Sequence, residues 1–342
     1  MESTPAPAVN QVGDSPDDAV LFASLAQTCD SLRSAIGQRI VGQDAVIEQM
    51  LIALFSGGHS LFIGVPGLAK TLLVQTVSDA LGLDFGRVQF TPDLMPADIT
   101  GTEVLEEDRS TGQRSLRFVQ GPLFTNLLLA DEINRAPPKT QAALLQAMAE
   151  SSVTAGGTTH SIDAPFMVFA TQNPIEQEGT YPLPEAQLDR FMFSIHVGYP
   201  SEEEEVEVVE RTTSGVPAPV PQVLDRAALL EFQRFVRRLP TSKAVHRYAV
   251  RLARATRGGA DTPSAVQRWV RWGAGPRASQ YLAIGARVRA ALLGHEVPDL
   301  ADVRAVAPAV LGHRLVLNFQ AEAEGVSTSD VVQAVLDEVA TS

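Results

Sequence analysis

Cysteine and positive charge are both scarce in this sequence of 342 residues. Its one cysteine, Cys29, excludes an intrachain disulfide, and we predict that it packs as an ordinary core residue of an amphipathic helix. Asp and Glu number 40 against 27 Lys and Arg, which gives a net charge of -13. We therefore do not expect nucleic acid to be bound by the whole surface, because such binding depends on neutralising phosphates. A local basic patch is still compatible with this balance.

Segments that would direct the chain to a membrane are also missing from the sequence. The first 18 residues are acidic and rich in Pro and Ser, without the basic and apolar regions of a signal peptide. No stretch approaches the roughly 18 apolar residues of a membrane-spanning helix. We expect a soluble, cytoplasmic protein with no membrane insertion, in which residues 1–18 form a disordered acidic tail.

Short apolar runs alternate with helical patterns up to residue 200. Strands are predicted at residues 60–63, 85–90, 127–130, 166–170 and 192–195, with helices ending near residue 80 and spanning 140–150. This alternation is typical of a parallel α/β sheet covered by helices. A long segment at about 91–122 and a β-hairpin at about 152–165 interrupt it, and such long insertions are usually functional. From residue 201 the pattern is mainly helical and predicts a smaller α-helical domain.

The strongest functional signal is a glycine-containing turn between a predicted strand and a predicted helix. Residues 64–71 read GVPGLAKT. In a phosphate-binding loop of this kind, backbone amides curl around the phosphates and the helix N-terminus faces them. Lys70 would reach the β- and γ-phosphates, and Thr71 would ligate magnesium. Ala69 replaces the usual glycine before the lysine, and its side chain is small enough for the backbone to approach a phosphate.

Polar residues follow two of the other predicted strands. Asp131 and Glu132 end the apolar run at 127–130, which places two carboxylates at the edge where open α/β sheets bind ligands. Asp131 would hold hydrated magnesium, and Glu132 would polarise the attacking water. Asn173 comes after the strand at 166–170 and could orient the same water. Its alternative role is that of a turn-forming residue before a proline.

An arginine in the run LPEAQLDRF at 183–191 has two interpretations. Arg190 could be a surface charge paired with Asp189, which is the common fate of such a residue. It could instead project into the site of a neighbouring subunit as an arginine finger, a role worth about 10³–10⁵ in rate in related phosphoryl transfer. Of the two, we favour the finger.

These four elements, in this order and spacing, resemble the AAA+ superfamily. The run DEINRAPPKTQ at 131–141 resembles the MoxR family in particular, and the resemblance covers roughly residues 22–335. It implies a five-stranded parallel αβα sandwich at 19–200, a helical lid at 201–342, and assembly into rings, usually hexamers. The segment at 91–122 resembles the helix-2 insert and the hairpin the pre-sensor-1 insert, which in relatives line a central pore or touch the substrate.

The resemblance also implies roles by position, with the loop as Walker A and Asp131 and Glu132 as Walker B. Asn173 resembles sensor 1, and Arg277 resembles sensor 2, where a lid arginine touches the γ-phosphate. The implied catalytic residues are Glu132, Asn173, Arg190 and Arg277. The implied nucleotide-binding residues are Val41, Gly42, Gly64, Pro66, Gly67, Leu68, Ala69, Lys70, Thr71, Leu72 and Asp131, of which Val41 and Gly42 would lie near adenine. Thr71 and Asp131 would be the magnesium ligands.

The function that this resemblance implies is magnesium-dependent ATP hydrolysis by a chaperone-like remodeller of protein complexes. Its partners would be further copies of itself, a protein with a von Willebrand factor A domain, and an unknown client protein. A chelatase-type motor that drives metal insertion would share the same inserts and is an alternative. A nucleic-acid-directed motor would need a basic insert, whereas Asp93, Asp98 and Glu103 belong to a mainly acidic one.

A basic stretch in the second domain has no assigned role. Arg247, Arg251 and Arg254 have the spacing of one helix face. This face could be solvated, or it could contact a neighbouring subunit or an acidic partner.

Overall fold

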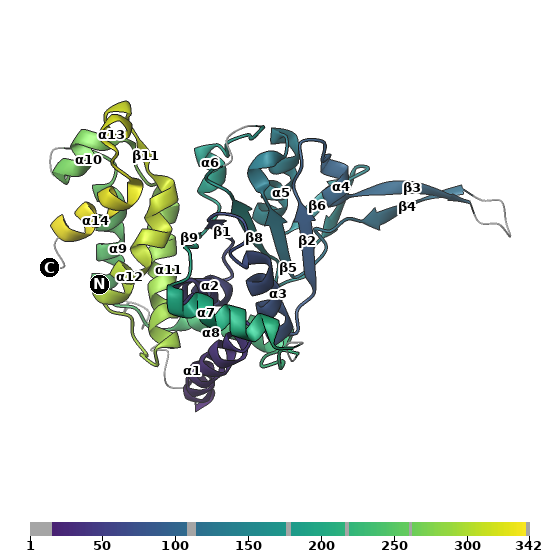
Figure 1. Cartoon of the computed structure of the whole chain (residues 1–342), viewed down its shortest axis with the longest axis horizontal. Helices are drawn as coiled ribbons and strands as arrows, with labels where there is room; N and C mark the ends of the chain where they lie inside the picture. Colours follow the sequence, from purple (N-terminus) through teal and green to yellow (C-terminus); the bar gives the residue numbers. More distant parts are fainter. Residues whose placement is uncertain (1–15, 108–113, 176–178, 216–218, 260–261, 340–342) are drawn as a thin grey trace, which may run out of the picture.

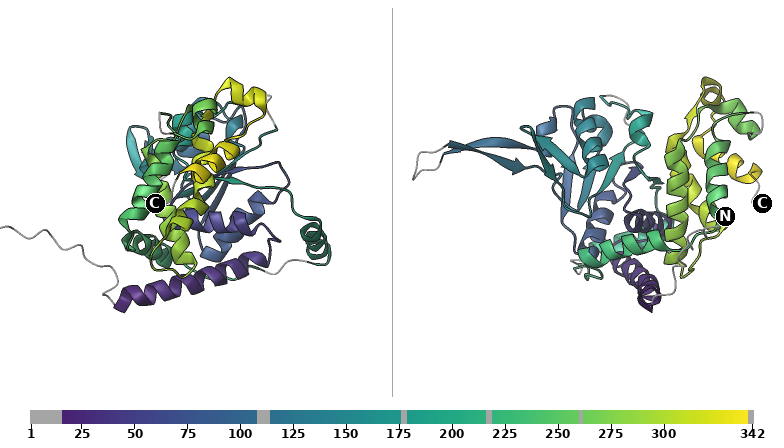
Figure 2. Two further views of the ribbon diagram at one scale, coloured as in Figure 1. Left: turned by 90° about the vertical axis from the view of Figure 1, so that its left-hand side faces the viewer. Right: turned by 180° about the vertical axis from the view of Figure 1, so that it is seen from behind.

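A five-stranded parallel sheet lies at the centre of the larger part of the molecule, and a helical part stands beside it (Figures 1 and 2). The computed structural model describes residues 16–107, 114–175, 179–215, 219–259 and 262–339. The strand order is β2-β5-β8-β1-β9, formed by β1 (Ser60–Ile63), β2 (Phe85–Gln89), β5 (Leu127–Asp131), β8 (Met167–Gln172) and β9 (Phe193–His196). The predicted class, a five-stranded αβα sandwich followed by a helical domain, is confirmed.

Helices cover the sheet and build the second part of the molecule. The α/β part holds α1 (Pro16–Gly37), α2 (Asp44–Ser56), α3 (Lys70–Leu81), α4 (Pro96–Thr100), η1 (Ile133–Arg135), α5 (Pro138–Glu150) and α6 (Glu185–Leu188). Next come α7 (Glu202–Thr213) and α8 (Arg226–Arg238), and α8 packs on α1, α2 and α11. The helical part holds α9 (Lys243–Ala255), α10 (Ser264–Trp269), α11 (Pro276–Leu292), α12 (Leu300–Leu311), η2 (Gly312–Arg314), α13 (Phe319–Glu324), α14 (Thr328–Glu338) and a small sheet of β10 (Val270–Trp272) and β11 (Val316–Leu317). No helix in the described ranges is long and apolar enough to cross a membrane.

The two faces of the sheet bury two different sets of side chains, because side chains alternate along a strand. Leu127 and Leu129 of β5 join a core with α1, α2, α3 and the helices of the second part. Leu128 and Ala130 point the other way and pack with α4 and α5. All four side chains are fully buried, which explains why this run is continuously apolar.

The N-terminal helix begins earlier than the sequence predicted. The tail was expected to extend to residue 18, but α1 starts at Pro16. Proline suits the first helical position, where its missing N–H group has no role and its fixed φ is already helical. Asp18 accepts a hydrogen bond from Arg238 of α8 at 2.9 Å, which holds this first turn against the rest of the protein. Residues 1–15 of the predicted tail lie outside the described residues.

Two hairpins stand at the sites of the two predicted insertions. Strands β3 (Gly101–Glu107) and β4 (Arg114–Gln120) form an antiparallel ribbon that projects far from the α/β part (Figure 1). Strands β6 (Ser152–Ala155) and β7 (Thr158–Ser161) form the second hairpin. The rings of Phe118 and His160 stack with their centroids 3.9 Å apart and so connect the two hairpins. Residues 108–113 of the first insertion lie outside the described residues.

Two further predictions can be located in the structure. Cys29 is fully buried in the core, and burial raises the pKa of its thiol to about 12, as expected for an unreactive core residue. Arg247, Arg251 and Arg254 all lie on α9 and are exposed. The sequence did not predict the small β10–β11 sheet.

His59 joins three neighbouring elements at the start of β1. Its Nε2 lies 3.1 Å from the carbonyl oxygen of Met148 in α5, and its Nδ1 accepts a hydrogen bond from Val168 N at 3.0 Å. A ring that accepts at Nδ1 and donates at Nε2 is neutral. Burial accordingly lowers the pKa of His59 to about 4.

We expect the protein to lose stability as the pH falls from 6.5 to about 4. In this window the unfolded chain protonates the histidine and the folded chain does not, so the loss attributable to His59 is about 3 kcal/mol. Chemical denaturation across this range measures it, and His59→Gln should flatten the dependence. His246→Gln, which changes an exposed histidine of α9, is the control and should leave the slope intact. Equal slopes for the wild type and His59→Gln would contradict this account.

Candidate active site

A cavity of about 450 Å³ opens where β1, β5 and β8 end. Its lining residues are Pro66, Gly67, Leu68, Ala69, Lys70, Thr71, Leu72, Arg87, Gln89, Asp131, Glu132, Thr171 and Asn173. The strands are parallel, so their carboxyl ends meet at one edge of the sheet. The structure thus brings together the predicted loop residues 66–72, both carboxylates and Asn173.

The loop that connects β1 to α3 is shaped to receive a ligand. Gly67 has a φ of 87°, and no atom lies within 4 Å of the position that a Cβ would occupy. Ala69 is also in the left-handed region, with a φ of 54° and a ψ of 20°, and it caps α3, which begins at Lys70. The first N–H groups of a helix have no partner within the helix, so the start of α3 offers free donors to an anion.

Lys70 extends back over this loop. Its Nζ donates to the carbonyl oxygen of Val65 at 3.0 Å and to that of Gly64. Gly64, which was predicted to bind nucleotide, is not among the residues that line the cavity. Burial lowers the pKa of Lys70, while the negative charges of Asp131 and Glu132 raise it. Backbone carbonyls thus hold the ammonium group near both carboxylates.

The Asp131 carboxylate is fixed by neighbours on both adjacent strands. Its Oδ1 accepts a hydrogen bond from Thr171 Oγ1 of β8 at 2.6 Å, and its Oδ2 accepts from Arg87 of β2 at 2.7 Å. The interaction with Arg87 is an ion pair in which the aspartate is mostly buried and the arginine half-exposed. The end of β5 is thereby oriented before any ligand arrives.

Glu132 is held in an uncommon backbone conformation, with a φ of 56°. Its N–H donates to Thr171 Oγ1 at 2.8 Å, and its Oε2 accepts from Gln89 Nε2 at 2.8 Å and pairs with Arg135 Nε at 3.3 Å. A non-glycine residue in the left-handed region costs about 1–3 kcal/mol and is concentrated at functional sites. The strained turn directs the glutamate into the cavity.

Arg87 and Gln89 were missed by the sequence analysis. They are two residues apart on β2 and so face the same side, and Gln89 is opposite Asp131 in the strand register. An alternating Arg-x-Gln pattern in a strand is the only local signal. Its meaning depends on the knowledge that β2 pairs with β5, which the sequence alone does not supply.

Asn173 lines the cavity and also makes a local turn contact. Its Oδ1 accepts a hydrogen bond from Ile175 N at 3.1 Å. This is the turn-forming role that was considered as the alternative. The bond orients the amide so that Nδ2 is left as the donor for a ligand or a water molecule.

Val41 and Gly42 line a second cavity of about 600 Å³, together with residues of α1, α2 and α7. The next residue, Gln43, donates from Nε2 to the carbonyl oxygen of Leu68 at 3.5 Å. The segment at 41–43 therefore lies against the loop at 66–72 and does not line the cavity beside that loop.

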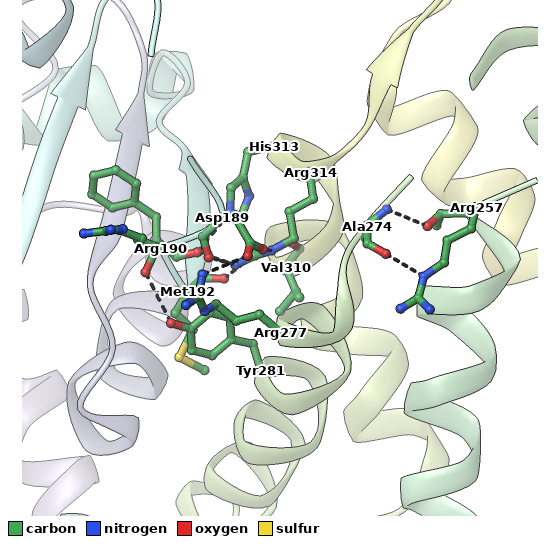
Figure 3. Close-up of polar contacts among 12 residues, drawn as sticks. Asp189, Arg190, Met192, Arg257, Ala274, Arg277, Tyr281, Val310, His313 and Arg314 are labelled. Carbon is green, nitrogen blue, oxygen red and sulfur yellow. Dashed lines mark hydrogen bonds and ion pairs between the residues drawn. The ribbon is translucent and has the colours of Figure 1, made fainter. Parts of the chain in front are cut away.

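The two predicted arginines lie outside the residues that line these cavities. The Arg190 guanidinium is half-buried and donates to the carbonyl oxygen of Leu145, on the side away from α11 (Figure 3). Arg277 pairs with the Asp189 carboxylate at 2.9 Å. Arg277, the residue that resembles sensor 2, is therefore engaged with Asp189 in this structure. Asp189 pairs with Arg277 and Arg314, and Arg190 is directed elsewhere.

Comparison with known proteins agrees with this geometry. Residues 59–193 match the model of the ATPase family associated with various cellular activities (AAA), and residues 263–335 match the AAA lid domain. The chain is 45% identical over 327 residues to Chaperone MoxR1 of Mycobacterium tuberculosis, an alignment that covers 95% of this chain and 85% of that protein. The chain belongs to the MoxR family of AAA+ ATPases.

A further MoxR protein and a solved structure extend this result. Protein MoxR of Methylorubrum extorquens is 32% identical over 333 residues, covering 89% of this chain and 92% of the relative. A crystal structure of a Cytophaga hutchinsonii protein assigned as an ATPase superposes with a TM-score of 0.87 at 39% identity, covering 95% of this chain and 98% of that one. Nucleotide binding and ATP hydrolysis are general properties of the AAA ATPase family.

The left-handed conformation of Ala69 predicts an unusual response to mutation. Ala69→Gly should raise the free energy of unfolding by about 0.5–1 kcal/mol, because a left-handed L-residue costs about 1–2 kcal/mol and glycine avoids most of it. Ala80→Gly makes the same change inside α3 and should lower it by about 1 kcal/mol or more. Urea denaturation of both variants tests this difference in sign. If both were equally destabilised, the loop would not have the conformation described here.

Proposed function

We propose that this chain is a magnesium-dependent ATPase that works as a ring, a hexamer in the first instance, and remodels protein complexes. The observation that carries the proposal is the convergence of Lys70, Asp131, Glu132 and Asn173 on one cavity beside the loop at 66–72. The loop amides and Lys70 would bind the β- and γ-phosphates. The segment at Val41 and Gly42 would bind the adenine side of the nucleotide.

The oxygen atoms at the cavity suit magnesium. Thr71 and Asp131 both line it and offer a hydroxyl and a carboxylate, which are ligands that Mg²⁺ prefers together with phosphates. Thr71 and Asp131 would hold the ion, which would supply positive charge to offset the negative charge of the phosphates. Thr171 keeps Asp131 Oδ1 oriented at 2.6 Å, so the carboxylate needs little rearrangement.

Glu132 and Asn173 are the residues that would act on the attacking water. Glu132 would accept a proton or polarise the water, because its carboxylate already points into the cavity. Gln89 and Arg135 hold the glutamate at 2.8 and 3.3 Å, which limits its rotation. Asn173 would orient the same water through Nδ2.

Arg190 would complete the site of a neighbouring subunit. It does not line the cavity of its own chain, so a role in catalysis requires a second chain. An arginine finger stabilises the charge of the transition state. Arg277 would reach a γ-phosphate after it separates from Asp189.

The exposed ribbon favours a protein as the partner of this motor. Leu105 and Leu116 face each other across β3 and β4 and are 61% and 65% exposed. Arg114 and Arg117 each pair with an acidic side chain at 3.0 Å, so strands β3 and β4 carry no excess positive charge. An exposed apolar pair with neutralised charges suits a protein surface better than a nucleic acid. We propose a partner with a von Willebrand factor A domain on family resemblance; a chelatase-type motor would use the same ribbon with a different partner.

We expect the ATPase activity per subunit to rise with protein concentration, because each site needs an arginine from another chain. Arg190→Ala should lower kcat by about 10³-fold or more and leave ATP binding intact. Arg268→Ala removes an exposed arginine paired with Glu324 in the lid and should change neither property. A rate that is independent of concentration and equal in the wild type and Arg190→Ala would mean that one chain holds a complete site.

A further inference from the structure

The segment at 189–192, which we name the finger segment, is bound to the lid along its whole length. All four of its carbonyl oxygens lie within hydrogen-bond distance of lid side chains, as Figure 3 shows in part. The partners are Arg314 and His313 of η2 and Tyr281 of α11. The backbone that carries Arg190 is thus held by lid residues about 90 to 125 positions further along the chain.

Arg314 makes most of these contacts. Its guanidinium donates to Asp189 Oδ1 at 2.8 Å, to the carbonyls of Asp189 and Phe191 at 3.0 and 2.6 Å, and to that of Met192 at 3.2 Å. A further donation to the Val310 carbonyl ties the same group to α12. The side chain is 2% exposed, so these bonds are formed away from water. A buried guanidinium is retained only where such partners satisfy it.

Tyr281 holds the arginine-finger residue itself. Its hydroxyl donates to the carbonyl oxygen of Arg190 at 3.2 Å, and the Arg314 guanidinium lies 5.1 Å from the centre of its ring. Tyr281 is on α11, the same helix that carries Arg277. Arg277 in turn pairs with Asp189 at 2.9 Å. A movement of α11 therefore acts on both ends of the Asp189–Arg190 pair.

We propose that Arg314 and Tyr281 are positioning residues for the arginine finger. They attach the finger segment to the lid, so the placement of Arg190 in the neighbouring site follows the position of the lid. The lid of one subunit is then coupled to the nucleotide site of the next through one rigid contact. This inference rests on the proposed function, because it requires that Arg190 acts on a neighbouring subunit.

Single variants give the first test. Arg314→Lys keeps the charge but loses the multiple donors of the fork, and Tyr281→Phe removes one hydroxyl with the ring kept in place. Both should lower kcat by about 10-fold to 100-fold with KM for ATP nearly unchanged, because a misplacement of about 1 Å can cost about 100-fold. Arg304→Lys is the matched control, because Arg304 binds Tyr248 and the Leu336 carbonyl within the lid. It should retain the wild-type kcat.

Mixed rings separate a positioning role from a general loss of structure. Each variant is mixed with Glu132→Gln subunits, which lack the catalytic carboxylate but carry an intact finger. Sites of Arg314→Lys or Tyr281→Phe subunits then receive a correctly held finger from the Glu132→Gln neighbour, and the activity should recover. A mixture of Arg190→Ala and Glu132→Gln subunits should recover in the same way. A mixture of Lys70→Ala and Glu132→Gln subunits should not recover, because each change inactivates the nucleotide site of the subunit that carries it and no intact site is left.

The outcomes distinguish the two levels of the account. Recovery with Arg190→Ala and with both positioning variants supports the inference. If Arg190→Ala recovers but neither positioning variant does, the inference is overturned and the proposed function stands. A wild-type kcat for both Tyr281→Phe and Arg314→Lys has the same consequence. Absence of recovery with Arg190→Ala overturns the neighbour-acting finger, and the inference with it. Tyr281→Phe decides the matter if Arg314→Lys does not fold.

Discussion

The burial of β5 on both faces is the constraint on which the rest of the site depends. Leu127 and Leu129 belong to one core and Leu128 and Ala130 to the other, and a shift by one residue would exchange the two sets. The register of β5 against β2 and β8 is therefore fixed. Because the strand can end at only one place, Asp131 emerges beside the phosphate-type loop.

The two carboxylates at this edge of the sheet have polar neighbours before any nucleotide binds. Lys70 lies near two carboxylates, Arg87 pairs with Asp131, and Gln89 donates to Glu132. Each carboxylate is thereby oriented before a nucleotide binds, so little energy is spent on reorienting it in the complex. Phosphoryl transfer requires this kind of preorganisation. Where β9 begins, Arg314 uses a comparable set of buried polar contacts to join the lid to residues 189–192.

Local patterns were sufficient for the parts of the site that one segment builds. The strand, loop and helix around Lys70 and the pair Asp131–Glu132 each follow from a continuous run, and the resemblance rests on them. Arg87 could not be predicted, because its role depends on strand order. Nor could the Asp189–Arg277 and Asp189–Arg314 contacts, because the residues involved are far apart in the sequence and meet only after the lid has docked.

We propose that the cavity beside the loop at 66–72 binds the triphosphate of ATP and that a second chain completes it. A structure of the protein with Mg²⁺ and a non-hydrolysable ATP analogue tests both halves directly. We expect the β- and γ-phosphates to lie against the loop and Lys70, with Arg190 of an adjacent copy directed at the γ-phosphate. A triphosphate bound elsewhere, or a site closed by Arg190 of the same chain, would contradict it.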